Sequence, residues 1–169
     1  ISSADRDAIM SKLKVLVDGM KECQKNSKGQ PGFLWAATRN NQSNVEFQFD
    51  NVENGKANII EEAWVPWYTM HKLIAGLVDV YNKTGYTPAK EVASSLGDWT
   101  YNRCSKWSTQ THDKVLSIEF GGMNDCLYDL YAITQNPKHA DAAHYFDHDA
   151  LFKKVVNVGA NALNGRHAN

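Results

Sequence analysis

Cysteine, net charge and long apolar runs are all scarce in this sequence, and each shortage excludes a class of protein. The three cysteines, Cys23, Cys104 and Cys126, lie far apart and form no CxxC pair, which argues against a zinc knuckle or a dithiol redox site. Their spacing leaves open one disulfide with a free thiol, or three thiols. A net charge of -1 argues against a nucleic-acid-binding surface. No apolar run is long enough to span a bilayer, and Ile1–Asp7 lacks a charged-then-apolar leader pattern.

The chain of 169 residues is long enough for one domain with a hydrophobic core, so residues 1–169 are taken as a single unit. Apolar residues recur at helical spacing along most of it. The expected helices cover residues 3–24, 66–83, 88–107, from the Gly121–Gly122 pair to about 135, 138–146 and 150–163. Residues 108–112, rich in Ser, Thr and Gln, are expected to form a loop.

One long segment, residues 25–63, interrupts the helical pattern. It is rich in Asn, Gln, Gly and Ser, and Val45, Phe47 and Phe49 alternate with polar residues, which favours a short strand or an extended loop. A loop of this length in a compact domain is usually functional or disordered. Its aromatic residues argue against disorder, so we expect an ordered loop.

An internal repeat indicates the architecture. The segment Leu77–Tyr81 recurs fifty residues later as Leu127–Tyr131, and Thr84 matches Thr134. Each copy is predicted to be a helix, a short turn and a second helix. Repeats of this length are typical of stacked αα-hairpins, which bury their apolar faces against neighbouring copies. The sequence therefore predicts an all-α fold, in which the shared Asp-x-Tyr-x-x-Thr pattern is structural.

The two copies differ where they begin, and function is expected there. The first copy begins with Trp67, Tyr68 and His71, and the second begins with Glu119 to Asp125, which includes Gly121, Gly122 and Asn124. Two glycines at a helix start allow close approach to the backbone, and the free N–H groups there carry partial positive charge. This combination suits a hydroxyl-rich or anionic ligand. A tight packing turn before a capped helix is the alternative.

Three motifs in order carry a family resemblance. They are Trp64-x-Pro66-Trp67-Tyr68-Thr69-x-His71-Lys72, Glu119-x-Gly121-Gly122-Met123-Asn124 and His167-Ala168-Asn169. Together they resemble the N-terminal half of glycoside hydrolase family 127-type proteins, the β-L-arabinofuranosidase-like group. The resemblance implies αα-hairpin repeats that form about half of an (α/α)6 barrel, which would be a fragment of the catalytic domain.

The resemblance also implies the activity. It implies hydrolysis of L-arabinofuranosides, or related residues in plant-type glycans, with retention of configuration. The family's nucleophile is a cysteine beside a zinc ion bound by cysteines and a glutamate, and none of the three cysteines here matches it. The catalytic residues and the zinc are therefore expected downstream of Asn169, and this chain alone is expected to be inactive. Carried over by motif, His71, Glu119, Asn124 and His167 would line the sugar pocket, while Asp125 departs from the family's glutamate.

Each candidate has a structural alternative. His71 is either a pocket residue or a half-buried histidine bonded to a neighbour, and Glu119 either orients a sugar hydroxyl or caps the glycine turn. Trp67 and Tyr68 form either a stacking wall or core packing, and we expect one of the two to be core. The acidic and histidine residues from His139 to His148 are a candidate metal cluster, because His144 and His148 are four residues apart and could lie on one face of a helix. A solvated helix end is favoured there, and no metal site is assigned to this chain.

Two functions remain to be distinguished. The enzyme interpretation is a glycosidase with carbohydrate as its partner, secreted to the extracellular space by resemblance alone. The alternative is a non-catalytic αα-repeat module that binds glycan or protein. In either case an open hairpin stack would expose an apolar flank. We expect the other half of the barrel or a homo-oligomer to cover it, and a monodisperse monomer would argue against the half barrel.

Overall fold

The protein is all-α, as the sequence predicts. The computed structural model describes residues 2–36, 43–56, 65–119 and 121–163, the side chains of Ala160 and Leu163 excepted. Helices within these ranges are α1 (Ser3–Lys25), α2 (Phe47–Glu53), α3 (Pro66–Thr84), α4 (Thr87–Cys104), α5 (Thr109–Ile118), α6 (Met123–Thr134), α7 (Pro137–His144) and α8 (Asp149–Val158), followed by a 3-10 turn at Gly159–Leu163. None of these helices is long and apolar enough to cross a membrane.

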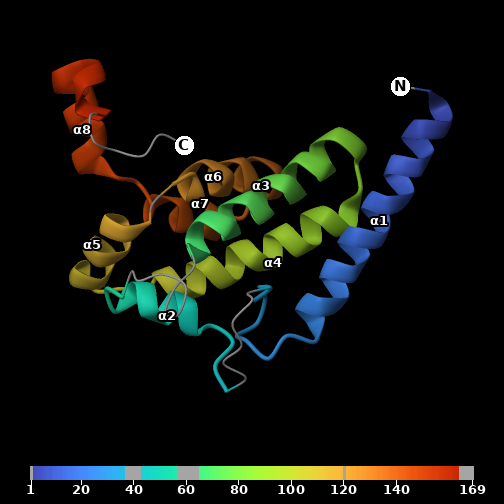
Figure 1. Cartoon of the computed structure of the whole chain (residues 1–169), viewed down its shortest axis with the longest axis horizontal. Helices are drawn as coiled ribbons and strands as arrows, with labels where there is room; N and C mark the ends of the chain where they lie inside the picture. The colour runs from blue at the N-terminus through green and yellow to red at the C-terminus, as the bar shows by residue number, and fades with distance from the viewer. Residues whose placement is uncertain (1, 37–42, 57–64, 120, 164–169) are drawn as a thin grey trace.

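Two αα-hairpins, α3–α4 and α6–α7, form the centre of the molecule (Figure 1). Their turns repeat at the predicted spacing, because α3 ends at Thr84 and α6 ends at Thr134. In each turn the threonine hydroxyl donates to the carbonyl four residues earlier, at 2.6 and 2.8 Å. The next residue, Gly85 or Gln135, takes the left-handed conformation that ends a helix. The shared pattern is therefore structural in both copies, as predicted.

The repeat also explains a buried histidine. His139 stands on α7 where Ala89 stands on α4, and both side chains are fully buried. A Cβ on Gly97 would lie 2.7 Å from the Cδ2 atom of the His139 ring. The absence of a side chain at Gly97 therefore leaves room for the imidazole. The ring bonds Thr134 at 2.7 Å and approaches Asp98. His139 therefore belongs to the core and does not join His144 in the cluster that the sequence suggested.

An aromatic cluster joins the long 25–63 segment to the hairpins. Phe49 of α2 packs edge-on against Trp67 of α3, with ring centroids 4.8 Å apart, and Trp67 packs against Phe146 at 5.0 Å. The rings of the cluster are Phe33, Phe49, Trp67, Trp99, Trp107 and Phe146. Such pairs add to the stabilisation gained from burial alone. This cluster holds the described parts of the segment against the core.

The short strand or extended loop expected around Val45–Phe49 is wrong, because residues 47–53 form α2. Glu46, Asp50 and Glu53 recur at helical spacing and share a face that meets the guanidinium of Arg103 on α4. Nη1 lies 2.8 Å from Glu46 and Nε lies 2.5 Å from Glu53, while Nη2 donates to Asp50. A helix satisfies all three carboxylates at once, whereas an alternating strand would separate Glu53 from the other two.

The loop expected at 108–112 is also wrong, because Ser108 caps a helix. Its hydroxyl accepts the N–H of Thr111 at 3.1 Å, and α5 follows. Few apolar residues face the core here, chiefly Val115 and Leu116, so the amphipathic signal is weak. The last helix, α8, lies apart from the hairpins in Figure 1 and carries exposed apolar residues, among them Phe152.

Candidate functional site

The two hairpins begin at the same end of the stack, as the sequence predicts. The start of α3 carries Trp67, Tyr68 and His71, and Glu119 and Gly122 lie against it just before α6. Contacts across this junction are close. A Cβ on Gly122 would overlap the Cε1 and Nε2 atoms of His71, so the glycine backbone lies directly against the imidazole. The candidate site is therefore built from the starts of two helices.

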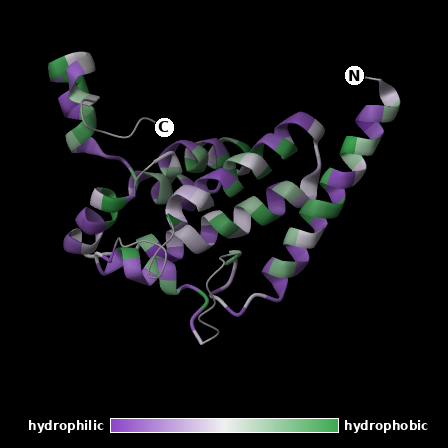
Figure 2. Ribbon diagram, in the orientation of Figure 1, coloured by the Kyte–Doolittle hydropathy of each residue, from purple (hydrophilic) through white to green (hydrophobic). Residues whose placement is uncertain are grey.

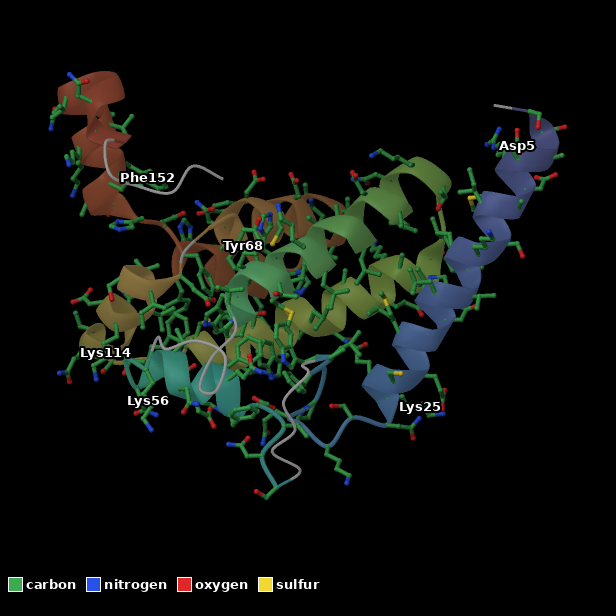
Figure 3. The ribbon with its side chains drawn as sticks, viewed as in Figure 1. Asp5, Lys25, Lys56, Tyr68, Lys114 and Phe152 are labelled. Carbon is green, nitrogen blue, oxygen red and sulfur yellow. The ribbon has the colours of Figure 1, made fainter. Side chains whose placement is uncertain are left out.

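Trp67 and Tyr68 take opposite roles. Trp67 is fully buried in the aromatic cluster, which is the core position that one of the two residues was expected to occupy. Tyr68 is 37% exposed at the start of α3, where Figure 3 labels it. The Lys72 ammonium lies 5.1 Å from its ring centroid, and the His71 ring lies 6.1 Å away. Only the tyrosine of this pair offers an aromatic face to solvent.

His71 is partly buried and has unused hydrogen-bonding capacity. Its Nδ1 atom is buried and has no hydrogen-bond partner among the residues that the structure describes. Burial lowers the pKa of His71, and the nearby Lys72 lowers it further, while Asp125 acts in the opposite direction. The ring is therefore neutral near pH 7, with one donor and one acceptor. That form suits an uncharged hydroxyl-bearing ligand.

Glu119 faces α3, and within the described residues it makes no hydrogen bond to Gly121 or Gly122. Its carboxylate accepts the backbone N–H of Trp67 at 2.7 Å, and the neighbouring backbone N–H of Tyr68 also favours its charged form. The side chain is nearly buried, and burial raises the pKa of Glu119 to about 7, against the opposing effect of these two N–H groups. Of the two roles predicted from the sequence, the geometry matches a capping carboxylate, but the helix that it caps is α3.

Asn124 is held by a polar network. Its Nδ2 donates to Asp147 at 3.3 Å, and its Oδ1 accepts the N–H of Asp125 at 2.8 Å. The other Asp147 oxygen accepts the Tyr128 hydroxyl at 2.9 Å and lies 2.9 Å from Nδ1 of His144. In the part of the chain that the structure describes, these bonds use one of the two amide hydrogens and one lone pair of Asn124. His167, the other candidate, lies outside the described residues.

The zinc ion implied by the resemblance would need several His, Cys, Asp or Glu side chains close together. In the described ranges, no three His, Cys, Asp or Glu side chains are grouped to hold a metal ion. His148 accepts the N–H of Leu151 through Nδ1 and caps α8. Cys104 and Cys126 are buried free thiols whose pKa is raised by burial, and Cys23 is an exposed free thiol on α1. These residues do not fit the zinc–thiolate site that the resemblance implies, and no step is derived through it.

A cavity of about 750 Å³ lies elsewhere, lined by the carboxylates of α2, Trp99, Trp107 and Arg103. Its acidic groups are already paired with Arg103, and both indole N–H groups donate to these carboxylates, at 3.2 and 2.8 Å. Sequence reasoning missed this cluster because the spacing of Glu46, Asp50 and Glu53 was the only signal for it. Its bonds are structural.

Gly122→Ala tests the contact between the two helix starts. The glycine has φ -94 and ψ 20, which alanine can adopt, so the added methyl conflicts only with the His71 ring. We expect a changed His71 imidazole signal in NMR and a loss of about 1–3 kcal/mol of stability. Gly76→Ala is the control, since nothing lies within 4 Å of a Cβ there. An unchanged His71 signal in Gly122→Ala would contradict the packing described.

Comparison with known proteins gives one match. A family model described as Beta-L-arabinofuranosidase, GH127 catalytic domain, matches residues 2–169. No curated protein matches the chain. The motifs that carried the resemblance lie within the matched range, and they include the two helix starts that form the candidate site.

Proposed function

Because the chain belongs to the β-L-arabinofuranosidase catalytic domains of glycoside hydrolase family 127, we propose that the starts of α3 and α6 form part of the wall that binds an L-arabinofuranosyl residue. The family is an (α/α)6-barrel family of glycosidases, so its substrate is carbohydrate. The observation that carries the proposal is the junction itself, where His71 lies against Gly122. Tyr68 and Asn124 flank this contact on α3 and α6.

The chemistry of these side chains suits a furanoside. The Tyr68 ring offers a flat face to the apolar side of a sugar. Neutral His71 and the second amide hydrogen of Asn124 match hydroxyls, which both donate and accept hydrogen bonds. His167 belongs to the same proposal by motif alone. The proposed substrate is an L-arabinofuranoside, or a related residue, in a plant-type glycan.

The proposal gives this chain a binding role and places the bond-breaking groups elsewhere. None of the three cysteines combines exposure with a position in the candidate site, and a reactive cysteine needs an accessible, stabilised thiolate. The zinc and nucleophile implied by the resemblance are thus assigned to residues outside the described ranges. An extracellular location is part of the same proposal and rests on the resemblance.

A covering partner is also proposed. Apolar side chains are exposed on the two outer helices, at Ile9, Val15 and Leu16 on α1 and at Phe152, Val155, Val156 and Val158 on α8. Figure 2 shows both helices outside the central hairpins, with apolar residues along them. Exposed apolar area of this kind is typical of contact surfaces. Further helices of the family's barrel, or a second copy of the chain, would cover it.

The binding role is tested by titrating the protein with 4-nitrophenyl β-L-arabinofuranoside. His71→Ala and Asn124→Ala should each weaken binding by about tenfold, the equivalent of one hydrogen bond of about 1–1.5 kcal/mol. Tyr68→Ala should also weaken it. Tyr131→Ala is the matched control, because this tyrosine is similarly exposed but lies near the other end of α6.

Two outcomes would contradict the proposal. One is wild-type affinity in all three variants, and the other is no binding of the glycoside by the wild-type protein. Release of nitrophenol, measured in the same samples, separates the two interpretations left by the sequence. Binding with hydrolysis supports the enzyme, whereas binding without hydrolysis supports a non-catalytic module.

A further inference from the structure

The first turn of α3 cannot satisfy its own N–H groups. The residue before it, Val65, has no side-chain acceptor and makes no capping bond. It also has a φ of 39°, a left-handed conformation that is unfavourable for a β-branched residue. The first N–H groups of a helix have no partner within the helix, so an external acceptor is needed. The conformation at Val65 must likewise be held by surrounding contacts.

Glu119 supplies that acceptor from a distant part of the sequence. It is the residue at which α5 ends, and its own N–H bonds the Val115 carbonyl at 2.7 Å. Its carboxylate reaches the N–H groups of Trp67 and Tyr68, the second and third residues of α3. A negative charge at a helix N-terminus is favoured by the helix dipole. Glu119 thus replaces the missing N-cap of α3.

The residues fixed by this cap carry the candidate site. Tyr68 directly follows Trp67, whose N–H the carboxylate binds, and His71 lies one turn later on the same helix. Three residues after Glu119, Gly122 packs against the His71 ring. Glu119 therefore holds the backbone of α3, and Gly122 packs against the ring of His71.

We propose that Glu119 is a positioning residue, which sets Tyr68 and His71 against the start of α6 by capping α3 and makes no contact with the sugar itself. This inference rests on the proposed function for its consequence in sugar binding. The capping geometry, however, can be tested without any ligand. The positioning role differs from the role carried over by motif, in which Glu119 would contact the sugar directly.

The test compares Glu119→Ala and Glu119→Gln with the wild type at a temperature where circular dichroism shows all three folded. Glu119→Ala should shift the NMR signals of His71 and Tyr68 and weaken binding of 4-nitrophenyl β-L-arabinofuranoside by about tenfold. Glu119→Gln keeps one oxygen that can accept the Trp67 N–H. It should restore affinity to within about threefold of the wild type.

Ser108→Ala is the matched control, because it removes the N-cap of α5, a helix whose cap lies outside the site. It should lower stability while leaving the His71 signal and the affinity unchanged. If Glu119→Ala does not fold, Glu119→Asp serves in its place, since the shorter side chain does not reach the two N–H groups. It should shift the same two signals.

Two results would overturn the inference. Unchanged His71 and Tyr68 signals in Glu119→Ala would show that the cap does not position them. Lost affinity in Glu119→Gln with an unchanged His71 signal would indicate a direct contact between Glu119 and the sugar. If the wild-type protein binds no glycoside, the proposed function fails. The His71 and Tyr68 signals still decide whether Glu119 positions α3.

Discussion

Replacing Arg103 with alanine should lower the free energy of unfolding by about 3–5 kcal/mol. The guanidinium is 12% exposed and bonds Glu46, Asp50 and Glu53 together. Without it, three carboxylates would face one another, and two of them, Glu46 and Glu53, are only 9% and 19% exposed. Burial already raises the pKa of Glu53 despite the attraction of Arg103, which shows how strongly this position disfavours charge. Urea unfolding followed by circular dichroism measures the loss.

Lys83→Ala is the control for this experiment. It breaks the exposed pair with Asp79 on α3, in which both side chains are more than half exposed. Pairs of that kind contribute about 0.2–1 kcal/mol. The loss of unfolding free energy in Arg103→Lys should fall between those of Arg103→Ala and Lys83→Ala, because an ammonium group keeps the charge but cannot form the planar three-way contact. If Arg103→Ala and Lys83→Ala lowered the free energy of unfolding equally, the three contacts of Arg103 would contribute no more than one exposed ion pair, against this prediction.

Raising the pH from about 4.5 to about 8 should destabilise the wild type relative to Glu119→Gln by about 3 kcal/mol. Burial raises the pKa of Glu119 from 4.5 to about 7 in the folded protein. Between these values the folded state holds a proton that the unfolded state has released, so stability falls as the pH rises. Below about pH 4.5 both states are protonated, and the difference between the proteins is constant.

The measurement is the unfolding free energy of both proteins at several pH values. Taking their difference removes the contribution of every other titrating group. Glu91→Gln, which removes an exposed carboxylate paired with Lys21, controls for the loss of a charge alone. A difference between wild type and Glu119→Gln that does not change with pH would exclude the raised pKa. The carboxyl signal of Glu119 in a ¹³C NMR titration gives the pKa directly.

The repeat makes the central hairpins predictable. Self-similarity over fifty residues fixes the relation between α3–α4 and α6–α7, and the turn residues Thr84 and Thr134 repeat their bonds faithfully. It also places both helix starts at one end, and so predicts that His71 and the glycine pair lie at the same end of the hairpins. Local patterns of this kind are readable because each residue acts on neighbours only a few positions away.

The errors arose where distant residues decide the local structure. The alternation of Val45, Phe47 and Phe49 favours a strand, but Arg103, some fifty residues on, holds the segment as a helix. Packing with remote partners commonly overrides local preference. The partner of Glu119 was missed for the same reason, because its acceptor role is set by N–H groups 52 residues earlier in the chain. No local signal reports such a pairing.

The aromatic cluster gives the protein an optical signal of its own. Trp67 lies 5.7 Å from Trp99 and from Trp107, close enough for their electronic transitions to couple. The near-ultraviolet circular dichroism of the protein should therefore be dominated by three indoles held in fixed orientation. Loss of side-chain packing removes such a signal while the far-ultraviolet helical signal persists. Since the backbone of Trp67 also bonds Glu119, the spectrum reports order at the start of α3 without any added label.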